Sequence, residues 1–158
     1  MSEMIINPTY TGKQYWTTVV VSGLLLSILL SIAYIIFYTR VYVASSYLFS
    51  IIYIIPFVWL SITLAFFKNK FVWSEFSYGK AFQMSFLSGM IGSVIFSGVI
   101  YILYAYVGME SRIGLYENGR QMRQLFSPMA ITVSILIINV ILSLFYSLII
   151  AIFARKKD

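Results

Sequence analysis

The stretch PMAITVSILIINVILSLFYSLIIAIF, residues 128–153, runs for 26 positions without a charged side chain. An α-helix rises about 1.5 Å per residue, so this stretch is long enough to cross the roughly 30 Å hydrocarbon core of a bilayer. Residues 16–38, 47–67 and 81–107 have the same property. The 158-residue chain is 61% hydrophobic and only 10% charged, which excludes a soluble globule, a secreted disulfide scaffold and a nucleic-acid-binding domain.

The four spans are joined by short connections at residues 39–46, 68–80 and 108–127. Short loops make consecutive helices antiparallel neighbours. We therefore expect an all-α polytopic membrane protein: one membrane domain over residues 1–158, folded as a four-helix transmembrane bundle that crosses up, down, up and down.

The distribution of basic residues predicts the orientation of this bundle. Seven lie on the side that would hold both termini: Lys13, Lys68, Lys70, Lys80, Arg155, Lys156 and Lys157. Four lie on the opposite side: Arg40, Arg112, Arg120 and Arg123. The excess predicts that both termini are cytoplasmic.

Local signals mark several helix boundaries. Ser127-Pro128 and Ser77 are suitable helix starts, with serine as the N-cap. Pro56 lies inside the second span and lacks a backbone donor, which predicts a kink. Residues 1–15 are polar and mixed, and we expect them to form a partly disordered tail.

The residue types that are missing exclude several kinds of chemistry. The chain has no Cys and no His, and none of the four spans holds an ionisable Asp, Glu, Lys or Arg. Zinc, haem and iron–sulfur ligation, thiol chemistry and proton-coupled pumping depend on such groups. We therefore expect no cofactor and no enzymatic activity. The net charge of +6 reflects basic residues at span ends rather than a nucleic-acid surface.

Small and polar residues recur on one face of spans one, three and four. Lipid cannot satisfy polar atoms, so these faces should turn inward and pack against neighbouring helices. The candidate helix-packing residues are Gly23, Ser27, Ser31, Ser85, Gly89, Gly92, Asn139 and Ser143. The alternative is a polar pathway or pocket. Asn139 is the first choice for a binding role, although an amide bonded between helices is the favoured interpretation.

Two segments outside the spans have enough chemistry for a partner. Residues 71–80, FVWSEFSYGK, lie among three lysines and suggest either an interfacial stretch at the inner leaflet or a simple loop. The outer loop, residues 108–127, either docks on the bundle or meets a partner. Its candidate partner surface is Arg112, Arg120, Met122, Arg123, Leu125 and Phe126.

Several motifs of the second half occur together. The run FSYGKAF at 76–82 opens a helix rich in small residues, a tyrosine-rich helix end follows at 101–106, and SLIIA at 147–151 precedes the basic residues 155–157. In these features the chain resembles an uncharacterised four-helix membrane family common in Bacteroidota, domain-of-unknown-function family 4199. The resemblance implies a four-span inner-membrane protein and supplies no activity, cofactor or site.

These observations predict a non-enzymatic helical subunit, scaffold or accessory factor. Its partners would be the lipid bilayer and either another membrane protein or a second copy of this chain. The alternative is a small transporter or lipid-handling protein that uses the polar faces of spans one, three and four. A dry, closely packed interior would favour the first function, and an internal cavity would favour the second.

Overall fold

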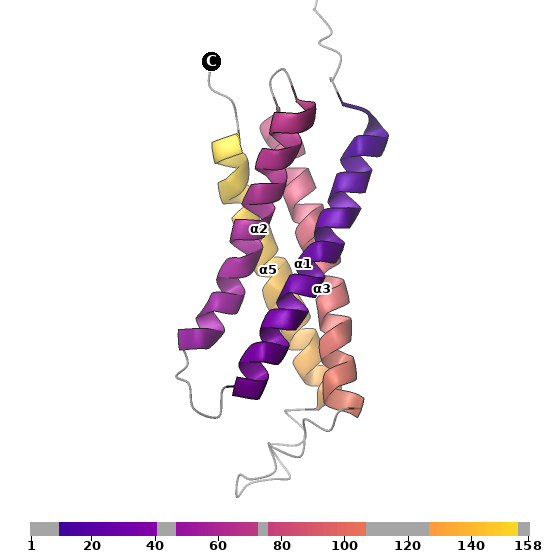
Figure 1. The fold of residues 1–158 in the computed structure, drawn as a ribbon, viewed down its shortest axis with the longest axis vertical. Coiled ribbons are helices and arrows are strands. Elements are labelled where there is room, and N and C mark those ends of the chain that lie inside the picture. The colour runs from indigo at the N-terminus through magenta and orange to yellow at the C-terminus, as the bar shows by residue number, and fades with distance from the viewer. Residues whose placement is uncertain (1–9, 41–46, 73–75, 107–126, 155–158) are drawn as a thin grey trace, which may run out of the picture.

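In the computed structural model the described residues are 10–40, 47–72, 76–106 and 127–154. Their regular structure consists of four helices (Figure 1): α1 at Gly12–Arg40, α2 at Tyr47–Phe71, α3 at Tyr78–Tyr106 and α5 at Pro128–Ala154. Each helix contains a segment long and apolar enough to cross a membrane. An all-helical fold with four candidate membrane spans is therefore confirmed. The outer-loop residues 108–126 and residues 155–158, which include the basic residues 155–157, lie outside the described residues.

The first helix begins earlier than the predicted span at residue 16. The backbone N–H of Thr11 donates to Oε1 of Gln14 at 2.8 Å, and the N–H of Gln14 donates to Oγ1 of Thr11 at 3.3 Å. This reciprocal pair is a capping box, which satisfies two donors at the start of a helix. Residues 12–15, which fall within the expected partly disordered tail, belong to α1.

The two predicted serine caps are confirmed. Oγ of Ser77 accepts from the N–H of Lys80 at 3.4 Å, and Oγ of Ser127 accepts from the N–H of Ala130 at 3.2 Å. Because Ser77 is the cap, α3 begins at Tyr78, three residues before the predicted span. The Ser77 cap therefore places the start of α3 more accurately than the run of apolar residues does, whereas the two signals agree on Pro128 for α5.

The helix α2 continues through Pro56, which is buried. A proline cannot donate to the carbonyl four residues earlier, and its ring disturbs the neighbouring turn. The hydroxyl of Tyr146 on α5 donates to the carbonyl of Tyr53 at 2.8 Å, three residues before the proline. A neighbouring helix thus supplies a donor next to the disturbed turn, as membrane bundles often do.

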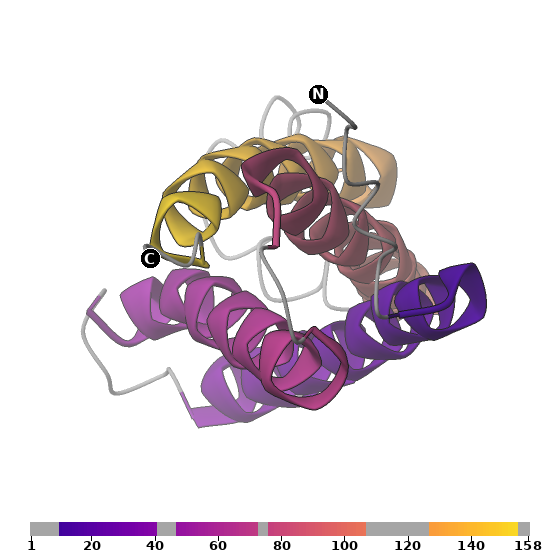
Figure 2. The same ribbon diagram turned by 90° about the horizontal axis from the view of Figure 1, so that it is seen from above.

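The helices pack as two adjacent pairs. Viewed from above, α1 and α2 form one side of the bundle and α3 and α5 form the other (Figure 2). The most extensive packing joins α3 to α5 and α3 to α1. The hydroxyl of Ser88 donates to the carbonyl of Val19, and the hydroxyls of Tyr34 and Tyr104 lie 2.8 Å apart. Residues in the first half of α1 therefore contact residues in the first half of α3, and residues near the two helix ends also contact each other.

The surface of the bundle is apolar as well as its core. Ile102 and Phe145 are each 55% exposed, and many other large aliphatic side chains on all four helices are exposed to a similar degree. In water such a surface would be unfavourable, whereas lipid tails solvate it well. The outside of the four helices is therefore suited to hydrocarbon.

An aromatic cluster joins three helices at one end of the bundle. The ring of Tyr10 lies 5.2 Å from that of Phe67 and 6.0 Å from that of Phe76, and Nζ of Lys80 lies 5.3 Å from the Tyr10 ring. Phe76 is only 2% exposed. Phe76 is therefore buried against Tyr10 and Phe67, while the choice between an interfacial stretch and a simple loop for residues 71–80 stays a prediction.

Candidate functional site

The helices α3 and α5 meet through very small residues. A β-carbon placed on Gly89 would lie 2.6 Å from Oγ and 2.7 Å from Cβ of Ser143, closer than van der Waals contact allows. Ser85 and Ser147 lie one turn from this contact on their respective helices, are buried, and have no hydrogen-bond partner among the described residues. We call this contact the α3–α5 seam. Its close backbone approach depends on glycine at position 89.

The two other candidate glycines lie on a different contact. A β-carbon on Gly23 would lie 2.7 Å from Cβ of Ile91, and one on Gly92 would lie 2.9 Å from Cδ2 of Leu26. Both positions therefore belong to the interface of α1 and α3. The small-residue face of α3 thus divides between two neighbours: Gly89 faces α5 and Gly92 faces α1.

Two of the four candidate packing serines bond within their own helix. Ser27 donates to the carbonyl of Leu24 and Ser31 to that of Ser27, each at 2.7 Å. Nδ2 of Asn139 donates to the carbonyl of Ile135 at 2.8 Å, also within its own helix. The expectation of an amide bonded between helices is wrong for this bond. Among the described residues, the buried side-chain polar atoms without a hydrogen-bond partner are the hydroxyls of Tyr15, Ser85 and Ser147.

A small hollow of about 60 Å³ lies beside Asn139, between residues of all four helices. Its lining is mostly apolar and aromatic, and includes Tyr34, Ile52, Phe96 and Ile135. Ligand pockets usually enclose about 300–1,000 Å³, whereas this volume accommodates only a few water molecules. The polar faces of α1, α3 and α5 therefore do not enclose a ligand-sized chamber at this point.

The helices α1 and α2 are joined by a polar contact that sequence reasoning missed. The hydroxyls of Ser22 and Thr63 lie 2.8 Å apart, and Nε1 of Trp59 lies 3.1 Å from both the carbonyl oxygen and Oγ of Ser22. We call this contact the α1–α2 seam. A signal was available in the sequence, because a tryptophan N–H within a membrane span needs an acceptor. The sequence alone does not identify that acceptor.

Ligand-sized hollows lie between helices at the outside of the bundle. Trp59 borders two of them on the α1–α2 side, with volumes of about 530 and 380 Å³. A third, of about 400 Å³, lies between α2 and α5. We call it the α2–α5 groove; its lining includes Phe57, Leu64, Ala65, Lys68, Asn69 and Ile150. All three hollows flank α2, the helix that packs least extensively against the others.

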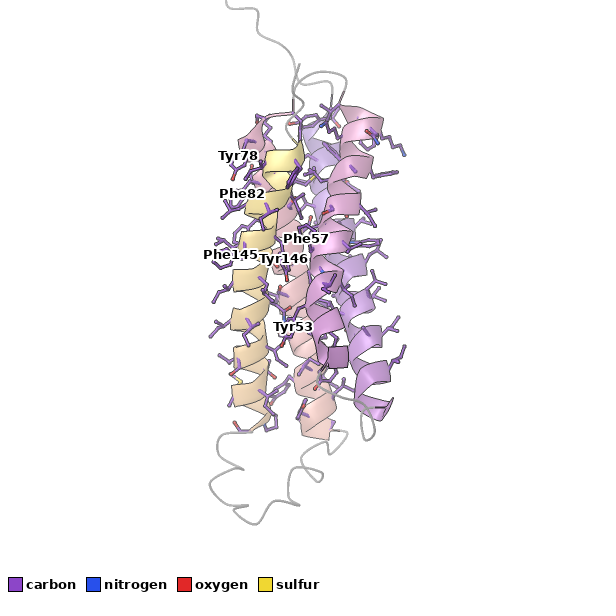
Figure 3. All side chains as sticks on the ribbon, turned by 90° about the vertical axis from the view of Figure 1, so that its left-hand side faces the viewer. Tyr53, Phe57, Tyr78, Phe82, Phe145 and Tyr146 are labelled. Atoms are coloured by element: carbon purple, nitrogen blue, oxygen red, sulfur yellow. The ribbon has the colours of Figure 1, made fainter. Side chains whose placement is uncertain are left out.

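The α2–α5 groove has different chemistry at its two ends. At the deep end the rings of Phe57 and Tyr146 pack edge to face with centroids 5.5 Å apart. Figure 3 shows Tyr146 directed toward α2, where Tyr53 and Phe57 lie, and Phe145 directed away from it. At the other end are Lys68, in the last turn of α2, and Asn69. The groove is therefore apolar inside with a cation and an amide at its mouth.

The predicted partner surface cannot be placed beside these features. Arg112, Arg120, Met122, Arg123, Leu125 and Phe126 all lie outside the described residues. In the part of the chain that is described, no three His, Cys, Asp or Glu side chains gather into a metal-binding group. Comparisons with protein-family models, curated proteins and solved structures find no match to this chain. The resemblance to domain-of-unknown-function family 4199 therefore stays a prediction.

Proposed function

We propose that this protein is a non-enzymatic membrane component, a helical subunit, scaffold or accessory factor that acts through lateral contacts in a bacterial inner membrane. One observation carries the proposal: close helix packing leaves little space at the centre of the described bundle. The contact of Gly89 with Ser143 is tighter than a β-carbon would allow, and the hollow beside Asn139 is only about 60 Å³. A solute route would need a wider polar passage.

The proposed topology follows the basic residues. Both termini are cytoplasmic and the chain crosses up, down, up and down, because seven basic residues fall on the side of the termini and four on the other. The chain lacks native cysteine, so single-cysteine variants provide a clean test. In intact cells, Leu115→Cys should react with an impermeant thiol reagent and Asp158→Cys should not. The opposite pattern contradicts the proposed orientation.

The proposed partner surface is the basic outer loop. Arg120 and Arg123 would pair with acidic groups of another membrane protein or of a second copy. Replacing both with Glu should leave membrane insertion intact and reduce partner recovery in quantitative copurification at low detergent. Replacing both with Lys keeps the charges and provides the matched control, which should retain recovery.

A flux measurement separates this function from its alternative, a small transporter or lipid-handling protein. The hollows beside Trp59, of about 530 and 380 Å³, are the observation that favours the alternative, since they are large enough for part of a lipid. Vesicles reconstituted with the purified protein should show no protein-dependent solute or lipid flux. Flux together with unchanged partner recovery in the Glu variant would overturn the scaffold function.

A further inference from the structure

The α2–α5 groove extends along the helices for a distance that matches one leaflet of a membrane. Phe57 and Lys68 are eleven positions apart, which at about 1.5 Å per residue corresponds to about 16 Å along the α2 axis. Half of a hydrocarbon core is about 15 Å deep. If Lys68 lies at the headgroup level, as a lysine at the end of a span does, the Phe57 end of the groove lies near the bilayer midplane.

The wall of the groove is suited to a hydrocarbon chain. Leu64 and Ile150 are buried beneath it, and Ala65 leaves space at its surface. Ser61 also lines the groove, but its hydroxyl donates to the carbonyl of Phe57 at 2.8 Å within α2. The Ser61 hydroxyl already has an acceptor, so the wall of the groove does not need a polar ligand along its length.

The mouth of the groove is suited to an anionic headgroup. The ammonium group of Lys68 and the amide of Asn69 supply hydrogen-bond donors at the end where α2 leaves the membrane. Lys70 follows in the same turn but does not line the groove, and its Nζ lies 5.2 Å from the Phe66 ring and 5.4 Å from the Phe71 ring. Basic groups at the membrane surface attract anionic phospholipids. Depth and charge together identify a single kind of occupant.

We propose that the α2–α5 groove binds one anionic phospholipid, with an acyl chain along Leu64 and Ala65 and the phosphate at Lys68 and Asn69. The proposal goes beyond the scaffold function and rests on it only for membrane insertion. It differs from general attraction to a charged surface because it requires a bound chain as well as a bound headgroup.

Native mass spectrometry of the full chain in a nonionic detergent tests the proposal. Phosphatidylglycerol and phosphatidylcholine are titrated separately, and retained lipid is counted. The unmodified protein should retain one phosphatidylglycerol in preference to phosphatidylcholine. In Lys68→Gln the concentration of phosphatidylglycerol for half occupancy should rise about five-fold, the effect of one basic residue near a membrane surface. Ala65→Phe fills the groove and should abolish retention although Lys68 remains.

Two matched variants control for charge and for size. Lys70→Gln removes an equal charge two residues away, where Nζ lies 5.2 Å from the Phe66 ring and 5.4 Å from the Phe71 ring, and should retain the lipid. Ala105→Phe enlarges another exposed alanine, on α3, and should also retain it. If Lys70→Gln loses as much lipid as Lys68→Gln does, binding depends only on general surface charge. That result would overturn the proposal.

Three further results would overturn it. The first is equal retention of both lipids by the unmodified protein. The second is equal retention of phosphatidylglycerol by the unmodified protein, Lys68→Gln and Ala65→Phe, which would limit Lys68 to stabilising the end of α2. The third is displacement of the lipid by millimolar inorganic phosphate, because the headgroup alone would then account for binding. Extraction by alkaline carbonate separates the two proposals. If the protein stays in the membrane but fails the lipid-binding tests, the lipid site is overturned and the proposed scaffold function is unaffected.

Discussion

The α3–α5 seam and the α1–α2 seam join neighbouring helices by opposite means. At the first, Gly89 and Ser143 bring two backbones so close that a β-carbon would collide. At the second, the bulky ring of Trp59 stands between the helices and bonds to Ser22, with hollows of about 530 and 380 Å³ beside it. Membrane helices associate in both ways: the α3–α5 seam depends on dispersion between closely packed atoms, and the α1–α2 seam depends on hydrogen bonds.

In this bundle, therefore, one helix contact stabilises the fold and another leaves space that a ligand can reach. Close packing leaves no space at the seam, whereas a hydrogen bond made through a large side chain holds the helices apart. The three ligand-sized hollows described above all flank α2. The α3–α5 seam should therefore determine stability, and the flanks of α2 should determine what the protein binds.

Replacing Gly89 with Ile should have the largest effect on stability. The first added carbon already lies 2.6 Å from Oγ of Ser143, so the helices must separate. Overpacking of this kind commonly costs about 1–3 kcal/mol. Thermal unfolding in detergent measures the effect. The matched control is Gly98→Ile on the same helix, where a β-carbon meets nothing within 4 Å.

A second substitution tests whether the collision itself is responsible. In the Gly89→Ala background, Ser143→Gly removes the atoms that the new methyl group meets and should restore part of the lost thermal stability. If Gly89→Ile and Gly98→Ile unfold at the same temperature, or if Ser143→Gly brings no recovery, the α3–α5 seam is not the tight contact described here.

Replacing Trp59 with Phe should have an intermediate effect. The change keeps most of the ring but removes the N–H that lies 3.1 Å from the carbonyl of Ser22. Side-chain hydrogen bonds between membrane helices contribute about 0.6–2 kcal/mol. Thermal unfolding should show a decrease smaller than that of Gly89→Ile. Trp16→Phe is the control, since Trp16 is 54% exposed, and a decrease as large in the control would remove the special role of the α1–α2 seam.

Replacing Asn139 with Leu should have the smallest effect. Its Nδ2 bonds to Ile135 of the same helix, so the substitution breaks no bond between helices. We expect a cost below the average of about 0.6 kcal/mol for membrane hydrogen bonds, with the fold and any assembly retained. Unfolding in detergent and recovery of copurifying protein are measured together. Unchanged stability with lost recovery would show that Asn139 has a binding role.

The spans and two helix starts could be predicted because they depend on local sequence. An uncharged run of 26 residues has few alternatives to a membrane helix, and Ser77 and Ser127 act on backbone groups three residues away. The capping box of Thr11 and Gln14 is equally local, but it lies before the uncharged apolar run that begins at residue 16, so that run does not indicate it.

The helix contacts could be predicted only in part. Helical periodicity identifies the face on which Gly89 and Gly92 lie, but the choice of neighbour depends on the crossing of three helices. Asn139 shows the same limit, because its inward position follows from polarity whereas its bond to Ile135 depends on the side-chain rotamer. The α2–α5 groove combines residues from two spans, so neither span indicates it alone.

The central place of α3 has a consequence for biogenesis. Because the chain is made from its N-terminus, α1 and α2 exist before α3, and Gly23 has no partner in Ile91 until then. Synthesis of residues 72–106 takes roughly two to seven seconds at usual rates of about 5–20 residues per second. During that interval we expect the bonds of Ser22 with Thr63 and Trp59 to hold the first helical hairpin together. These polar bonds would then protect a newly inserted hairpin from wrong partners until α3 arrives.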